Sequence, residues 1–201
     1  MSSVLQLPSE LVPKSLKAQN AAVAKLLMSW GSMASPVLKI QATSQGIQSS
    51  IYSILKRQLT CIGLPSTLEP VSLTNDGRRP DGLILGPWYS GLSLVWDATV
   101  VDTFAQGHYK DCARQAGFAA TKTEAAKCQK YHDLQSNYHL QPVAIETTGV
   151  YGKSTAPVLS GLAKRLVDVS GDPRECQWLH QRLSLAVVRG NAASILACFR
   201  V

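Results

Sequence analysis

The sequence predicts an α/β (α+β) fold in which a small β-sheet is flanked by helices. Runs with helical spacing of apolar residues occupy both ends of the chain, and short runs rich in Val, Ile and Thr lie between them, next to glycine turns. The length of 201 residues and a hydrophobic fraction of 45% are enough for one domain with a sizeable core. This composition excludes a wholly disordered chain.

The N-terminal part of the chain is predicted to be helical. Apolar residues at helical spacing, with lysines on the other face, predict a helix over residues 14–30, followed by a breaker or linker over 31–39. A second helix is predicted over residues 46–59. Its apolar stripe consists of Ile47, Ile51, Ile54, Leu55 and Leu59. Residues 1–45 are therefore expected to be a helical extension and linker, and residues 46–201 the main domain.

The middle of the chain is predicted to contain a β-hairpin. Two prolines and an Asn-Asp-Gly turn separate it from the second helix. Its strands are residues 81–86 and the Val- and Thr-rich run 92–103, joined by the turn-like residues 87–91. Residues 108–136 are rich in Ala, Lys and Gln and are expected to form one or two helices, interrupted near Gly117.

One further strand and two helices complete the predicted domain. The strand covers residues 141–152 and ends in a glycine turn, and the next helix covers residues 157–169. The last helix, residues 173–199, is expected to open with Asp172 as its N-cap and Pro173 at its first position. Its small residues GNAAS are a conceivable dimerisation face.

Charge is unevenly distributed in this basic chain, whose net charge is +7 and whose pI is about 9.3. Residues 1–80 carry eight basic and three acidic side chains, and residues 151–201 carry seven and three, whereas residues 81–150 carry five and seven. The simplest interpretation is a solvated basic surface with acids on turns. The alternative is a divalent-metal site framed by a surface that attracts phosphates.

Two aspartates and a following helix form the candidate chemical site. If the two runs pair as a hairpin, Asp81 and Asp97 come close together, because antiparallel neighbours are about 5 Å apart. Two such carboxylates repel each other unless a cation lies between them, which favours Mg²⁺. Lys127 or Lys130 would then position a water molecule or stabilise charge that develops on a phosphate.

The motifs RRPDG, LVWDATVVDT, KCQKY and PVAIETTGVYG resemble the restriction-like endonuclease domain of site-specific non-LTR retrotransposons, within the PD-(D/E)xK nuclease superfamily. The resemblance extends over about residues 46–197. In the family's pattern Asp81 matches the aspartate of the Pro-Asp pair and Asp97 the acid of the following strand. Lys127 and Lys130 match the K-x-x-K-Y helix.

This resemblance implies a restriction-endonuclease-like mixed β-sheet core flanked by helices, and Mg²⁺- or Mn²⁺-dependent DNA cleavage with metal ligands at Asp81 and Asp97. It also implies DNA, or alternatively RNA, as partner, a reverse transcriptase context, and an intracellular, nuclear location. The chain departs from the pattern at Thr99, where the superfamily has its lysine. The family often has a histidine and an asparagine in the helix before the Pro-Asp pair. Neither is evident here, where residues 49–52 occupy that region. The alternative function is therefore that of a catalytically inactive, transposon-derived nucleic-acid-binding module.

Other candidates have weaker support. Glu146 is predicted either as a third metal ligand or orienting acid or as an ordinary surface or capping group. Arg78 and Arg79 are candidates for phosphate contacts beside the acidic pair, and Tyr131 is expected in the core. The five widely spaced cysteines favour neither disulfides nor a zinc site. Without a bilayer-spanning apolar run or a secretory signal, a soluble intracellular protein with no membrane contact is expected.

Overall fold

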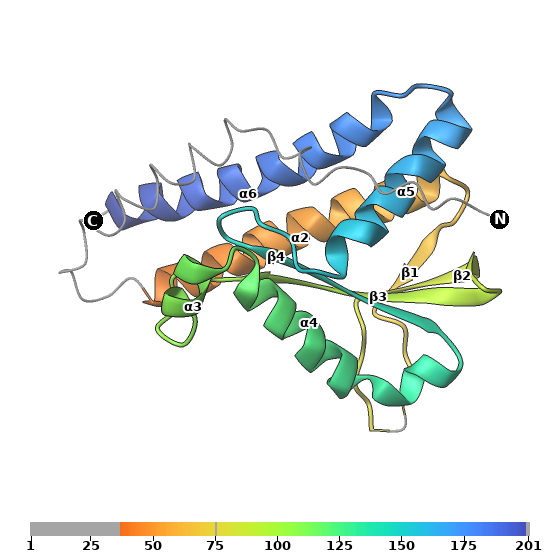
Figure 1. Ribbon diagram of the computed structural model, residues 1–201, viewed down its shortest axis with the longest axis horizontal. Helices are drawn as coiled ribbons and strands as arrows, with labels where there is room; N and C mark the ends of the chain where they lie inside the picture. The colour runs from red at the N-terminus through yellow and green to blue at the C-terminus, as the bar shows by residue number, and fades with distance from the viewer. Residues whose placement is uncertain (1–36, 75, 200–201) are drawn as a thin grey trace. The chain divides into compact units, whose positions relative to one another are not determined.

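The computed structural model describes residues 37–74 and 76–199, which form a four-stranded mixed sheet with helices on both faces (Figure 1). The elements in chain order are α2 (Val37–Cys61), β1 (Ser66–Leu68), β2 (Gly82–Tyr89), β3 (Leu92–Val101), α3 (Tyr109–Arg114), α4 (Phe118–Lys130), the 3₁₀ helix η1 (His132–Ser136), β4 (His139–Glu146), α5 (Thr155–Ser170) and α6 (Glu175–Phe199). The predicted α/β class is confirmed. The helix predicted over residues 14–30 lies outside the described residues.

The sheet has the strand order β1-β2-β3-β4. Strands β1, β2 and β3 pair antiparallel in succession, and β4 pairs with β3 in parallel over eight residues. Helices α3 and α4 make the crossover connection that a parallel pair requires. β3 is therefore a central strand, with a hairpin partner on one side and a parallel partner on the other.

The predicted hairpin of β2 and β3 is confirmed, with a shorter turn than expected. Ser90 and Gly91 alone make the turn, both with positive φ (51° and 79°), as in the two-residue turns that match strand twist. The residues predicted as turn before them belong to β2. Gly82 pairs with Trp96, and a Cβ added to Gly82 would lie 2.2 Å from the indole ring. This close approach requires glycine directly after Asp81.

The two faces of the sheet carry different layers (Figure 1). On one face α2, α5 and α6 pack on the main core, which includes Trp96, Ala98 and Val100 of β3 and the predicted stripe residues of α2, with Ile54 only partly buried. The other face is covered by α4 and η1 over a smaller cluster of Leu83, Val95, Tyr131 and Leu134. Because side chains alternate along a strand, Asp97 and Thr99 belong to this second face.

Two helix starts differ from the sequence prediction. α2 begins at Val37, so residues 37–45, expected as extension and linker, continue the helix. α6 begins at Glu175, because Pro173 and Arg174 form a turn in which Asp172 Oδ1 accepts the Arg174 backbone N–H at 2.9 Å. Among the described residues, no helix is both long and apolar enough to cross a bilayer.

Candidate acidic site

Asp81 and Asp97 lie opposite each other across the β2–β3 hairpin. The antiparallel register pairs Gly82 with Trp96, so the residue before Gly82 faces the residue after Trp96. Asp81 Oδ2 accepts the backbone N–H of Ala98 at 2.6 Å, which fixes its carboxylate beside β3. The two aspartates predicted from the sequence are therefore brought together. Asp97 lies within β3, rather than at its end, because β4 extends the pairing beyond it.

Asp97 is buried and forms an ion pair with α4. Its side chain is 3% exposed, and its Oδ2 forms an ion pair with the ammonium of Lys127, whose side chain is 22% exposed, but accepts no hydrogen bond from any described residue. A buried carboxylate without a partner is costly, so this lysine offsets most of that cost. Of the two lysines that the sequence left open, Lys127 is the one that reaches the acidic pair.

The carboxyl group of Asp81 is hard to ionise in this environment. Burial, and then the negative charge of Asp97, raise the pKa of Asp81 to about 7, while hydrogen bonds from Tyr52 and the Ala98 N–H act in the opposite direction. Burial and the facing carboxylate of Asp97 thus favour a proton on Asp81, which a bound cation would displace. The pair is poised to change its charge near neutral pH.

Tyr52 of α2 completes this environment and was not identified from the sequence. Its hydroxyl hydrogen-bonds to the Asp81 carboxylate and lies 3.4 Å from the Ala98 carbonyl oxygen, and its ring meets Trp96 edge-on at 5.7 Å. Burial and the acids raise the pKa of Tyr52, so the phenol stays neutral. The available signal was its position beside Ile51 at the border of the apolar stripe, where a residue with an apolar body and a polar tip fits.

The remaining basic candidates lie at the edge of the site or elsewhere. Lys130 places its ammonium 4.6 Å from the ring centre of Tyr131, which is fully buried as expected. The Tyr131 hydroxyl donates to the backbone carbonyl of Arg79 at 2.9 Å and holds the segment before Asp81. Arg78 pairs with Asp76 and Asp133, so its charge is already neutralised, whereas the Arg79 side chain is exposed.

Glu146 does not join the acidic pair, which corrects its prediction as a metal ligand or catalytic acid. It is 1% exposed at the end of β4, and its Oε1 accepts the backbone N–H groups of Ala119 at 3.0 Å and Ala120 at 3.4 Å. These are unpaired donors of the first turn of α4. The carboxylate is therefore a helix cap, which was the alternative interpretation of this residue.

A second buried acid, Glu124 of α4, plays the same role and was missed. It is 4% exposed and accepts the backbone N–H groups of Ser154 and Thr155, each at 2.9 Å, and the Thr155 hydroxyl at 2.6 Å. It thus caps α5 from a neighbouring helix. No local sequence signal could have found it, because its partners are about 30 residues away.

The donor set of the acidic pair suits a hard divalent cation. Two facing carboxyl groups, of which Asp81 has its pKa raised to about 7 by burial and by the charge of Asp97, offer the oxygen ligands that Mg²⁺ and Mn²⁺ prefer. The buried hydroxyl of Thr99, on the same face of β3, has no hydrogen-bond partner within residues 37–74 and 76–199. In the same part of the chain no group of three or more His, Cys, Asp or Glu side chains is placed to hold a metal. Water would have to supply the other ligands.

Comparison with known proteins gives no family assignment: no family model matches the chain, and no curated protein matches it significantly.

Proposed function

We propose that this protein is a metal-dependent DNA endonuclease that hydrolyses phosphodiester bonds at the acidic pair. The observation that carries the proposal is the convergence of Asp81, directly before β2, with Asp97 of β3 and Lys127 of α4 at one point of the sheet. The sequence motifs that resemble retrotransposon endonucleases include these same three residues. The mixed sheet with helices on both faces supports a restriction-endonuclease-like fold as part of the proposal.

Each residue has a defined task in this proposal. Asp81 and Asp97 hold Mg²⁺ or Mn²⁺, which supplies Lewis acidity toward the scissile phosphate and a more acidic water molecule. Tyr52 and the Ala98 N–H orient the Asp81 carboxylate through hydrogen bonds. Lys127 would stabilise the negative charge that accumulates on the phosphate oxygens when the metal takes over the charge of Asp97, so that the ammonium is no longer neutralised there.

The second candidate function is that of an inactive nucleic-acid-binding module. The observation in its favour is the Lys127–Asp97 ion pair, which balances the charge of the buried acid within the protein alone. In this case the acidic pair would be a structural remnant, and nucleic acid would bind without divalent cations.

Nicking of supercoiled plasmid tests the proposal. We expect the full-length protein to convert supercoiled DNA to open circles in Mg²⁺ or Mn²⁺ and not in EDTA. Asp81→Asn, Asp97→Asn and Lys127→Met should each lower the rate roughly 100-fold or more, as loss of one electrostatic contact to the reacting group does. Lys130→Met is the matched control from the same helix and should keep most of the activity.

Circular dichroism spectra and urea midpoints of every variant ensure that folded proteins are compared. Absence of nicking by the wild type, or equal nicking by the wild type and Asp97→Asn, would refute the proposed activity. Plasmid binding in EDTA by a protein that never nicks would favour the inactive module.

A further inference from the structure

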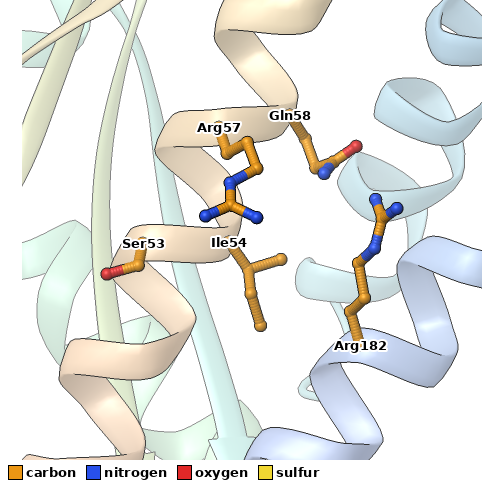
Figure 2. A pocket seen from close by; sticks show the side chains of 5 residues that line it. All are labelled: Ser53, Ile54, Arg57, Gln58 and Arg182. Atoms are coloured by element: carbon orange, nitrogen blue, oxygen red, sulfur yellow. The ribbon is translucent and has the colours of Figure 1, made fainter.

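A pocket between α2 and α6 is lined by two arginines. Its walls are Ser53, Ile54, Arg57 and Gln58 of α2 and Arg182 of α6, and its volume is about 90 Å³ (Figure 2). Figure 2 shows the side chains of Arg57 and Arg182 extending into the gap between the two helices from opposite sides. A volume of this size is about three times that of one water molecule in the liquid.

The positive charge of this pocket is not neutralised by the protein. Within the described chain neither Arg57 nor Arg182 has a carboxylate within ion-pair distance, whereas Arg78, Lys127 and Arg174 each pair with an aspartate. Gln58 presents a side chain that is only 2% exposed to the same pocket. Two guanidinium groups without a carboxylate partner among the described residues, together with the Gln58 amide, offer hydrogen-bond donors around one hollow.

The same charge continues along the helix pair. The side chains described on α2 and α6, in residues 45–61 and 175–196, include four Lys or Arg and a single acid, Glu175. A second, shallower hollow of about 350 Å³ is lined by Trp178, Gln181, Arg182 and Leu185, so it shares Arg182 with the first. The second hollow adds no further basic side chain, and the excess positive charge of the two helices comes from Lys56, Arg57, Arg182 and Arg189.

We infer that the pocket between Arg57 and Arg182 binds a phosphate group of a nucleic-acid strand that lies along α2 and α6. Guanidinium groups match phosphate oxygens in geometry and charge, and they hold them with paired hydrogen bonds. Four basic side chains against one acid on the two helices favour a polyanion by charge complementarity. Neither arginine belongs to the motifs of the nuclease resemblance.

This strand site would serve the proposed nuclease, but it does not depend on catalysis. Ser53, which lines the pocket, directly follows Tyr52, which hydrogen-bonds to Asp81, so the two sites occupy adjacent faces of one helix. Because the inference concerns binding alone, it is tested in EDTA, where failure of hydrolysis has no influence on the result.

The test measures binding of a fluorescein-labelled 20-base single strand and a 20-base-pair duplex to the full-length protein by fluorescence anisotropy, over a range of KCl concentrations. Arg57→Gln/Arg182→Gln should weaken binding at low salt roughly tenfold or more, because two charge-assisted contacts are lost. The slope of log K against log[KCl] should become less steep by about 0.7 for the single strand or about 0.9 for the duplex, because one phosphate contact is lost.

Lys153→Gln/Lys164→Gln is the matched control, since it removes the same charge at two exposed lysines that do not line the pocket. It should change the affinity less than threefold. Equal losses in the two double variants, or no loss in Arg57→Gln/Arg182→Gln, would overturn the inference. Displacement of the oligonucleotide by millimolar inorganic phosphate at fixed ionic strength would also overturn it, because the pocket would then be a site for free phosphate.

Discussion

Replacement of Lys127 by methionine tests the electrostatics of the acidic site without reference to activity. The variant leaves Asp97, which is 3% exposed, without its cation and beside Asp81. Breaking a buried ion pair costs about 3–5 kcal/mol, whereas an exposed pair contributes about 0–1 kcal/mol. Lys127 itself is 22% exposed, so we expect Lys127→Met to lower the free energy of unfolding by roughly 2–3 kcal/mol at pH 7.

The double variant Asp97→Asn/Lys127→Met removes both charges and should cost only about 1 kcal/mol, because no unpaired charge remains. The difference between the unfolding free-energy change of the double variant and the summed changes of Asp97→Asn and Lys127→Met gives the coupling between the two side chains. Urea unfolding in EDTA measures all four proteins, with Lys130→Met as control, where about 0.5–1 kcal/mol is expected from the loss of its contact with Tyr131. Additive single variants, or equal effects of Lys127→Met and Lys130→Met, would refute this account of the site.

The other predictions concern the second carboxyl group and the helix caps. The pKa of Asp81 is raised from 3.8 to about 7, so the contribution of this carboxyl group to stability is present below about pH 4 and is lost as the pH rises through 7. Asp81→Asn should flatten this decline and raise the melting temperature at pH 8. Thermal unfolding from pH 4 to 8 measures both effects. Glu124→Ala should lower the free energy of unfolding by about 2–4 kcal/mol, since three buried donors lose their acceptor, whereas the exposed Glu69→Ala should change it by less than about 0.5 kcal/mol in the same urea titration. Gly152→Ala should also destabilise the protein, because its Cβ would lie 2.2 Å from Glu124 Oε1; a midpoint equal to that of the wild type would show that the Glu124 cap can shift.

Local patterns were sufficient to predict the elements that build the acidic site. The period of the apolar residues located most of α2, and the Val- and Thr-rich run located β3. The proximity of Asp81 and Asp97 followed from the hairpin, because antiparallel pairing of Gly82 with Trp96 places the residue before Gly82 opposite the residue after Trp96. The choice between Lys127 and Lys130 did not follow, because it depends on how α4 is rotated against the sheet.

Features that depend on distant partners could not be predicted from the sequence. Glu146 was a candidate ligand because a strand-end acid looks the same in sequence whether it binds a metal or caps a helix. Only the packing of α4 against β4 shows that its carboxylate faces Ala119 and Ala120. Arg78 likewise looked available for phosphate until the fold placed Asp133 against it.

Binding of Mn²⁺, followed by electron paramagnetic resonance in a titration at pH 7.5, tests the central claim about the acidic pair most directly. Bound Mn²⁺ should be detected with the wild-type protein and lost in both Asp81→Asn and Asp97→Asn, while Glu146→Gln, if folded, should keep it. Equal binding by the wild type and the two aspartate variants would contradict the assignment of Asp81 and Asp97 as the metal site.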